Sequence, residues 1–590
     1  MLIISGTLLV LASWILASCV LAAIGLLPAL ISSQGRLNPV VIRWSLWWGL
    51  LVVAVFAYLA NLAWPLRSAH TAWALIALTA IMLMLAWVVA RRRKGARRPG
   101  AWHVTRRPLS WLLSAVLLLV LVYMAAAALG PVTNYDSGLY HLGAVQYAGE
   151  HATIHGLANL FFGLGYGNAE FPLAALLGNS PWGFEGFRLL NGLFMVVLTV
   201  DLLLRLHQRR LTVGFFVLAL GLATAWIPLI ALSDYWVTSP TQDSSVYIVT
   251  IAAVAYLADA VTKQRTWLPD ASTALALGIL LVLLRPTMLV FAGMLVAVLL
   301  VKAWSMRGRR ATAGLLANAL LVGVAAVVAG IAATARDYVL SGWVQYPLSL
   351  AHADVAWLAP DPTPDRLATL GYHRDASHLW ESTQGWGWVG PWIGRLPSQW
   401  EFSYFVLLIV LGIIGLAIAG RVGRIGLRIR GLVLVLAPSA IAVVVWWVAT
   451  PPSFRFIWGP LFMVPATSIG WAFWRLHASR SRATADPWLK LLIVCLAVPV
   501  ALVALYSLVF RFHYEQIVEE HSWNAGVSVP YALAPVIDVP IRHMQLASGL
   551  DLTVPVDSDQ CWLHFPLCTP NPASGLGLLG ERYEEGLVHK

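Results

Sequence analysis

The sequence predicts an all-α polytopic membrane protein, because of its composition and its long apolar stretches. Of 590 residues, 59% are apolar and only 11% are charged, whereas soluble domains have roughly 45–50% and about 25%. Stretches of about 20 apolar residues, the length that crosses a bilayer as a helix, recur along the whole chain. A water-soluble enzyme is therefore excluded, and one integral membrane unit is expected.

Fourteen apolar segments, separated by charged or turn-forming residues, are expected to be membrane helices. In chain order they are 2–31, 41–65, 71–90, 108–130, 186–206, 211–232, 245–262, 272–284, 287–302, 312–333, 403–420, 431–449, 456–475 and 489–511. Arg285-Pro286-Thr287 interrupts the stretch 272–302, and proline ends or kinks a helix. We therefore expect two short helices there, joined as a hairpin.

The basic residues predict an orientation for these segments. With fourteen segments, all the basic clusters fall on one side; they lie at 91–107, 205–210, 263–265, 302–310, 421–430 and 475–490. Short basic loops stay in the cytoplasm, so both termini and the long segments 131–185, 334–402 and 512–590 are expected outside. The net charge of +12 therefore indicates topology and attraction to anionic membrane lipids, and not nucleic-acid binding.

This topology divides the chain into four regions. An N-terminal three-span extension with a basic cytoplasmic loop covers 1–107, a transmembrane module 108–475, the last span 476–511 and an outer tail 512–590. In the tail, Cys561 and Cys568 are expected to form a disulfide, because they lie close together on the oxidising side. A zinc site with His564 is the alternative, although further ligands at a recognisable spacing are missing.

Asp136 is the main catalytic candidate. Pro131 and the turn Asn134-Tyr135-Asp136-Ser137 follow a spanning segment, so this carboxylate is expected just above the hydrocarbon boundary, where lipid head groups lie. It has two interpretations. Asp136 either caps an interfacial helix over 139–158 or removes a proton from a substrate, with His141 as a neighbour.

Two arginines are candidates for binding a lipid phosphate. Arg285 occupies the hairpin turn of an otherwise uncharged stretch, where a guanidinium is costly unless it faces an anion or extends to the interface. Arg455, in Pro451-Pro452-Ser453-Phe454-Arg455-Phe456, has the same two interpretations. Asp243 precedes a helix, where it could be an N-cap.

Other transport and energy-coupled functions find little support. The cytoplasmic loops contain no phosphate-binding G-x-x-x-x-G-K-[ST] motif. Acidic residues are nearly absent from the predicted mid-membrane regions, which argues against a proton-coupled transporter. Asp201 is expected to form an ion pair with Arg205, four residues on, whose side chain extends to the inner interface.

Taken together, these motifs resemble the GT-C superfamily of polyprenyl-phosphate-sugar glycosyltransferases. The resemblance covers roughly 108–475 and rests on four features: an outer-loop Asp after a spanning helix, a short Arg-Pro-Thr hairpin, a Gly342-x-x-x-Tyr346-Pro347 turn and a late outer Arg455-Phe456. More closely, four stretches are similar to an uncharacterised family of bacterial polytopic membrane proteins: Asn134-Tyr135-Asp136 through His141, Gly156-Leu157-Ala158-Asn159-Leu160, Ser239-Pro240 with Asp243, and Cys561 through Cys568-Thr569-Pro570.

The resemblance implies a GT-C-like bundle in the bacterial inner (cytoplasmic) membrane with its active site on the periplasmic face. There an inverting transfer would move a sugar from a polyprenyl-phosphate-linked donor to a glycan, lipid or protein acceptor of the cell envelope. Asp136 would be the general base, and Arg285 and Arg455 would bind the donor phosphate. Contacts with substrate or metal are expected from Tyr135, His141, Glu170, Asp243 and Tyr346.

Two points stay open at this stage. The first outer loop lacks an Asp-x-Asp pair, so a requirement for a divalent cation is undecided. A lipid-linked saccharide flippase or polymerase-type protein would bind the same lipid without using Asp136 as a base, and a non-catalytic scaffold of envelope assembly would bind no lipid phosphate.

Overall fold

The computed structural model describes most of the chain and is mainly helical. The described residues are 2–35, 40–92, 108–207, 211–231, 233–264, 266–306, 312–422, 429–479, 487–510, 520–523 and 527–589. Much of the predicted basic clusters, including 93–107, lies outside these ranges. Within them, eleven helices are long and apolar enough to cross a bilayer, which confirms a multi-pass helical membrane protein.

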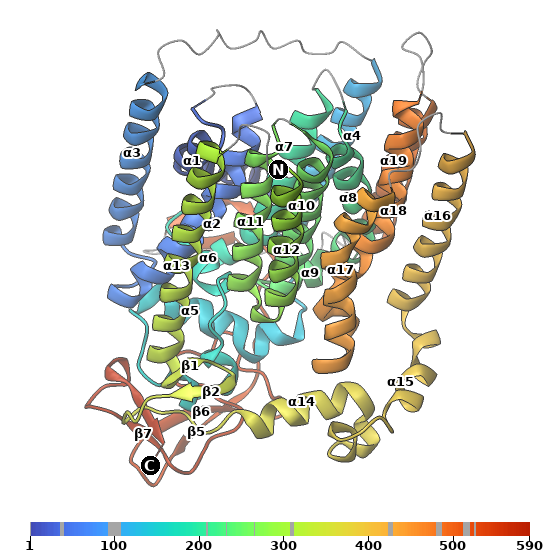
Figure 1. Ribbon diagram of the computed structural model, residues 1–590. Coiled ribbons are helices and arrows are strands. Elements are labelled where there is room, and N and C mark those ends of the chain that lie inside the picture. The colour runs from blue at the N-terminus through green and yellow to red at the C-terminus, as the bar shows by residue number, and fades with distance from the viewer. Residues whose placement is uncertain are drawn as a thin grey trace.

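The predicted segments all overlap helices of one bundle (Figure 1). These are α1 (Leu2–Ser32), α2 (Val40–Ala63), α3 (Ala69–Arg92), α4 (Pro108–Ala127), α7 (Leu190–Leu206), α8 (Val213–Ala231), α10 (Gln242–Thr262), α11 (Leu268–Leu284), α12 (Leu289–Ser305), α13 (Thr312–Ser341), α16 (Trp400–Val422), α17 (Ile429–Ala449), α18 (Trp458–Ala478) and α19 (Pro487–Phe510). The apolar parts of α8, α11 and α19 are shorter than a full span, so the count of fourteen spans stays a prediction.

Burial separates central from peripheral helices. Helix α10 is almost completely buried, whereas α3, α13 and α16 expose most of their apolar side chains, as lipid-facing helices do. Helix α2 packs against α1, α6, α7, α11 and α13. The first two helices are therefore part of the same bundle as the later ones.

The break in the predicted hairpin lies where proline requires it. Helix α11 ends at Leu284, Arg285 is extended, and Pro286 begins the 3-10 turn η5 (Pro286–Met288) that leads into α12. The two helices pack against each other. Arg285 is thereby held at one end of the bundle.

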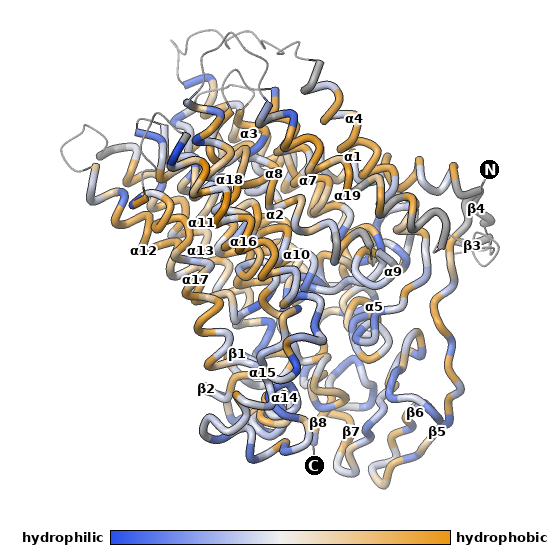
Figure 2. Tube along the Cα trace, turned by 90° about the vertical axis from the view of Figure 1, so that its right-hand side faces the viewer, coloured by the Kyte–Doolittle hydropathy of each residue, from blue (hydrophilic) through white to orange (hydrophobic). Residues whose placement is uncertain are grey.

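The connecting segments and the tail gather at that same end, which we call the loop end (Figures 1 and 2). Its helical elements are η1 (Ser137–His141), α5 (Leu142–Glu150), η2 (Leu157–Asn159), η3 (Phe162–Gly165), α6 (Glu170–Leu177), η4 (Gly183–Leu189), α9 (Ser233–Trp236), α14 (Thr363–Asp375), η6 (Ala376–His378), η7 (Glu381–Thr383), α15 (Val389–Arg395), η8 (Leu396–Ser398), η9 (Phe454–Ile457) and η11 (Tyr583–Glu585).

Short β-hairpins accompany the helices. Within the described residues, four antiparallel pairs form: β1 (Trp343–Gln345) with β2 (Leu348–His352), β3 (Glu520–Trp523) with β4 (Val527–Ala532), β5 (Ile541–Gln545) with β6 (Asp551–Pro555), and β7 (Leu576–Leu578) with β8 (Leu587–His589). Figure 2 shows less apolar colouring over α14, α15 and the tail strands than over the bundle. The tail is thus a small unit of short β-hairpins and loops packed on a helical membrane domain.

The helix expected over 139–158 is present only as far as Glu150, and it is largely buried rather than lying exposed at an interface. The π-helical turn η1 continues into α5, which ends at Glu150 and buries most of its residues. The tail covers this segment: Leu567 N–H donates to the Tyr147 hydroxyl at 3.1 Å, and Thr569 donates its hydroxyl to Leu160 O at 2.9 Å. These contacts join residues about 400 positions apart, so local periodicity could not reveal them.

Candidate functional site

A cavity of about 330 Å³ lies where α10, α12 and α17 meet the loop-end segments. Asp136, Arg285 and Arg455, which the sequence pointed to as base and phosphate ligands, all line it. The lining also includes Thr369 and His373 from α14, and Figure 1 shows α14 lying across the loop end of the bundle. These residues come from four stretches that are far apart in the sequence and meet in one space.

Local structure directs the Asp136 carboxylate into this cavity. Asp136 stands at the N-cap position of η1, but its side chain makes no capping hydrogen bond. Asn134 forms the turn instead, because its Oδ1 accepts the Asp136 N–H at 2.9 Å. The Asp136 Oδ2 lies 3.0 Å from Arg455 Nη1. The capping interpretation of Asp136 is therefore wrong, and its carboxylate faces a cavity arginine.

The two arginines come from different turns that touch. Arg455 lies in η9, which follows Pro451-Pro452. Arg285 donates from Nη1 to Phe456 O at 3.0 Å and pairs through Nη2 with Asp243. Asp243 is not the N-cap of α10, because Thr241 accepts its N–H. Arg285 therefore pairs with an acid inside the protein and does not extend to the interface.

The cavity contains two ion pairs that differ in accessibility. The side chains of Asp136 and Arg455 are 17% and 27% exposed, whereas those of Asp243 and Arg285 are 4% and 10% exposed. Two carboxylates stand against two guanidiniums, so the four charges nearly cancel. An anion that enters can reach the first pair more readily than the second.

Apolar side chains form another part of the wall. Val290 of α12 and Ala442, Val445 and Trp446 of α17 line the cavity. Next to them in sequence, Leu289 is 65% exposed and Val444 58% exposed. The charged groups thus share the cavity with apolar side chains of two helices that also expose apolar residues.

His141, another predicted site residue, also lines the cavity. It is fully buried, and neither ring nitrogen has a hydrogen-bond partner. Burial lowers the pKa of His141 to about 3, so the imidazole is neutral at ordinary pH.

Three other predicted site residues do not line the cavity. Glu170 is completely buried, its Oε2 accepts the Ser245 hydroxyl at 2.6 Å, and burial raises its pKa to about 8. Tyr346 packs in a separate small cluster with Trp343. Tyr135 is exposed, and its hydroxyl donates to Asp559 of the tail. A direct substrate contact from these three is not supported.

Sequence reasoning missed several lining residues. Gln242, Tyr140, Tyr166, Trp446 and His373 all face the cavity. Gln242 and Tyr140 lie beside residues that had been singled out, so their neighbourhood was a usable signal. His373 lies in α14, whose folding back over the bundle nothing in the local sequence indicates.

The tail is docked on the turn that carries Asp136. Cys561 and Cys568 form a disulfide. Trp562, between them, donates its backbone N–H to Gly138 O at 2.9 Å. Gln560 Nε2 donates to Tyr135 O at 2.6 Å. His564 Nε2 lies 2.9 Å from Val539 O. The disulfide-closed loop thus packs within two residues of Asp136.

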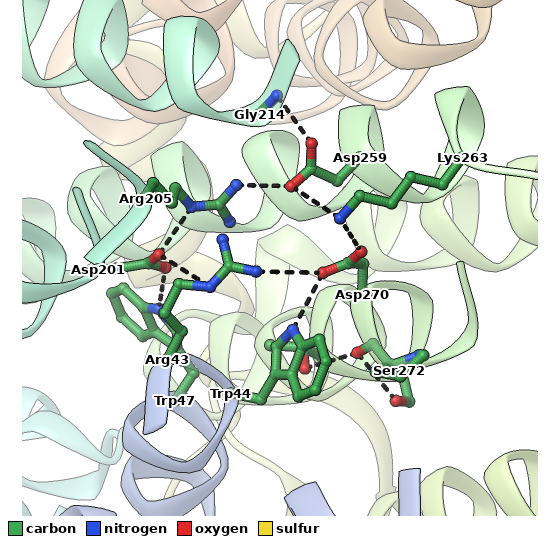
Figure 3. Close-up of polar contacts among 12 residues, drawn as sticks. Arg43, Trp44, Trp47, Asp201, Arg205, Gly214, Asp259, Lys263, Asp270 and Ser272 are labelled. Atoms are coloured by element: carbon green, nitrogen blue, oxygen red, sulfur yellow. Dashed lines mark hydrogen bonds and ion pairs between the residues drawn. The ribbon is translucent and has the colours of Figure 1, made fainter. Parts of the chain in front are cut away.

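A second charged cluster lies in the bundle (Figure 3), and none of its residues lines the cavity. Arg205 Nε and Nη1 are each 2.7 Å from a carboxylate oxygen, of Asp201 and Asp259 respectively. Lys263 Nζ lies 2.6 Å from Asp270 Oδ2. Arg43, the sixth member of this inner network, lies within 4 Å of Asp201 and Asp270. All except Lys263 have side chains at most 1% exposed.

The inner network corrects one prediction. Asp201 and Arg205 do form the expected i, i+4 pair, but both are buried and neither extends to the interface. Arg43 lies on α2, about 160 residues before Asp201 in the sequence. Residue spacing along α7 therefore could not reveal this partner. The acids are paired with bases, as buried charges in a membrane domain have to be.

A search for metal-site geometry and comparisons with known proteins add three findings. In the part of the chain that the structure describes, no group of three or more His, Cys, Asp or Glu side chains is arranged to hold a metal ion. A family model described as a domain of unknown function (DUF8201) matches residues 8–462, a range that includes every cavity-lining residue and excludes the tail. No curated protein and no solved structure matches the chain.

Proposed function

Since the chain belongs to the family of the domain of unknown function DUF8201, we propose its function from the cavity itself. The protein is a membrane glycosyltransferase that moves a sugar from a polyprenyl-phosphate-linked donor to a glycan, lipid or protein acceptor of the cell envelope. The observation that carries this proposal is the shared cavity of Asp136, Arg285 and Arg455 beside an apolar wall.

Each part of the donor has a matching surface. Guanidinium groups bind phosphate oxygens through charge-assisted, often bidentate hydrogen bonds, and Arg285 and Arg455 offer two such groups. An isoprenoid chain is apolar, and Val290, Val445 and Trp446 supply a wall beside lipid-facing helices. A soluble sugar nucleotide would leave this wall without a partner.

The proposed reaction proceeds by direct displacement. A phosphate that binds Arg455 takes the place of Asp136, whose carboxylate is then free to accept a proton from the acceptor hydroxyl. The hydroxyl oxygen attacks the anomeric carbon as the bond from that carbon to the phosphate oxygen breaks. Attack from the opposite side inverts the configuration. Polyprenyl phosphate leaves with the bonding electrons, and both arginines stabilise its added negative charge.

The proposal also specifies the side of the membrane on which the transfer occurs. The cavity lies at the loop end, and the positions of the basic clusters in the sequence support an outer location for that end. The transfer would then occur on the periplasmic face of the bacterial inner membrane, in a GT-C-like module over 108–475 within a fourteen-span protein. The inner network would lie at the cytoplasmic end.

The test is Asp136→Asn in a strain that lacks the chromosomal gene. Deletion should remove one sugar from an envelope glycan, lipid or protein, as seen by mass spectrometry, and the wild-type gene should restore it. Asp136→Asn keeps the shape but cannot accept the proton, so transfer should fall by about 10²- to 10⁴-fold. Asp354→Asn, at an exposed position of the same loop end, is the matched control and should restore transfer fully.

Binding separates the mechanism from its rivals. Purified Asp136→Asn protein should still bind polyprenyl phosphate in native mass spectrometry, because both arginines remain. Undiminished transfer by Asp136→Asn would rule out this base and favour a flippase. An unchanged envelope after deletion, with no lipid phosphate bound, would favour a scaffold.

A further inference from the structure

We propose that His141 and Gln242 form a hydroxyl-binding subsite in the cavity, which selects a neutral sugar on the donor and rejects an acidic one. This inference rests on the proposed function and specifies its substrate class. Both residues line the cavity that holds the two ion pairs. Each has a buried polar atom that no protein group satisfies.

The His141 ring is held in place but not hydrogen-bonded. Its side chain is 1% exposed, and Nδ1 and Nε2 both lack a partner. Tyr140 packs edge-on at 4.5 Å between ring centroids, and Phe171 lies at 5.2 Å. Buried polar atoms in proteins are nearly always hydrogen-bonded. A fixed imidazole with two unsatisfied nitrogens at a cavity wall therefore indicates that a ligand supplies the partners.

The charge state of His141 defines what that ligand offers. Burial, together with Arg455 and Arg285, keeps the imidazole neutral, although Asp243 acts in the opposite direction. A neutral imidazole has one N–H donor and one acceptor nitrogen. A hydroxyl group also donates and accepts, so two neighbouring sugar hydroxyls match the ring. A phosphate or carboxylate has no proton for the acceptor nitrogen.

Gln242 adds a second acceptor. It is the first residue of α10 after the Thr241 cap, and its Oε1 is buried without a partner. Tyr140 and Tyr166 supply aromatic surface to the same cavity, against which the C–H face of a sugar ring can pack. The subsite thus combines hydroxyl acceptors, one donor and apolar ring faces.

The distribution of positive charge excludes an acidic sugar. Of the described residues that line the cavity, only Arg285 and Arg455 carry a permanent positive charge, and the donor phosphate requires them. His373 also lines the cavity, but burial lowers its pKa to about 4, so it is neutral. A uronic acid would therefore bring a second negative charge to Asp243 and two neutral imidazoles.

The experiment compares donor analogues that differ only in the sugar. Full-length protein in nanodiscs is titrated with polyprenyl phosphate alone and with polyprenyl phosphate carrying glucose, mannose, galactose, arabinose or glucuronic acid. In the wild type, at least one neutral sugar should tighten binding about tenfold or more over the sugar-free lipid, and glucuronic acid should not. His141→Phe keeps the aromatic packing and should reduce the sugar-dependent gain about tenfold.

Four further measurements make this result specific. Sugar-free polyprenyl phosphate should bind His141→Phe as it binds the wild type, which also reports correct folding. His141→Asn retains a donor and an acceptor and should recover part of the gain. Gln242→Met provides a second, independent loss, and His543→Phe, at an exposed tail position, should change nothing.

The outcomes distinguish the two levels of the proposal. Failure of the wild type to bind even sugar-free polyprenyl phosphate would overturn the proposed function and this inference with it. Normal binding of that lipid with no gain from any neutral sugar would overturn the subsite alone. So would tightest binding of the glucuronic acid conjugate, or an unchanged sugar preference in both His141→Phe and Gln242→Met.

Discussion

Gly138→Ala should disturb the site through the tail, because this glycine lies between the Asp136 turn and Trp562. An added methyl group would lie 2.7 Å from Cδ2 and 2.8 Å from Cζ2 of the indole. Carbon atoms pack at about 3.5–4.0 Å. The turn and the indole would therefore have to separate by about 1 Å.

The indole is poorly placed to yield. Trp562 is 4% exposed, and its backbone N–H is bonded to Gly138 O. Its neighbour Cys561 forms the disulfide with Cys568, and the backbone of Cys568 pairs with that of Thr553 in a β-bridge. The turn that carries Asp136 should therefore move instead. Overpacking of this kind costs about 1–3 kcal/mol, and a shift of about 1 Å at a catalytic group can lower the rate about 100-fold.

A double-mutant cycle measures the effect. Unfolding free energy and sugar transfer are compared for Gly138→Ala, Trp562→Leu and the double variant. The methyl group should be much less harmful once the indole is gone, with a coupling energy of at least about 1 kcal/mol. Gly143→Ala, where the nearest atom would be an ordinary 3.6 Å away, is the control. Equal losses with and without Trp562, or none at all, would refute the reasoning.

Two further predictions concern buried acids. Asp201→Asn leaves the buried Arg43 and Arg205 with one carboxylate fewer, so the unfolding free energy should drop by about 3–5 kcal/mol. Glu585→Gln, in the exposed ion pair with Arg582, should change it little, and equal effects would contradict the role of burial. Glu170 has its pKa raised from 4.5 to about 8 by burial, so the folded state retains a proton that the unfolded state loses, and stability should fall as pH rises from about 4.5 to about 8. Glu170→Gln should remove this pH dependence, which amounts to roughly 3 kcal/mol of unfolding free energy by pH 7. Melting curves of both proteins between pH 5 and 8 measure it. The same loss of stability with pH in the wild type and in Glu170→Gln would count against the prediction.

The sequence predicted the parts of the fold that depend on local composition. Apolar length predicted the helices, and Pro286 predicted the break between α11 and α12. The common side of the outer turns predicted that Asp136, Arg285 and Arg455 could meet, and they line one cavity. These features depend on residue type and on order along the chain, which the sequence contains directly.

Long-range pairing is what the sequence could not predict. The amphipathic pattern after Asp136 resembled an interfacial helix, but the tail buries it by contacts such as Leu567 with the Tyr147 hydroxyl. Asp243 resembled a helix cap because it stands at the start of α10, where Thr241 caps instead. Local sequence contains the signal for a cap or a helix face, but not the identity of the distant segment that covers it.

The same pairing of acid and base serves two purposes at the two ends of α10. Asp243 and Asp259 are sixteen residues apart on this helix, or about 24 Å. At one end, Asp259 belongs to a network whose arginines are at most 1% exposed, so a solute cannot displace a partner and the charges fix the packing of α2, α7, α10 and α11. At the other end, the pairs border a cavity, and the Asp136–Arg455 pair is the more accessible. In the proposed mechanism, the carboxylate keeps the guanidinium charged and oriented until a phosphate takes its place, and this exchange releases the base. Exposure, and not residue type, is then what distinguishes the buried structural ion pairs from the pair that we propose to be reactive.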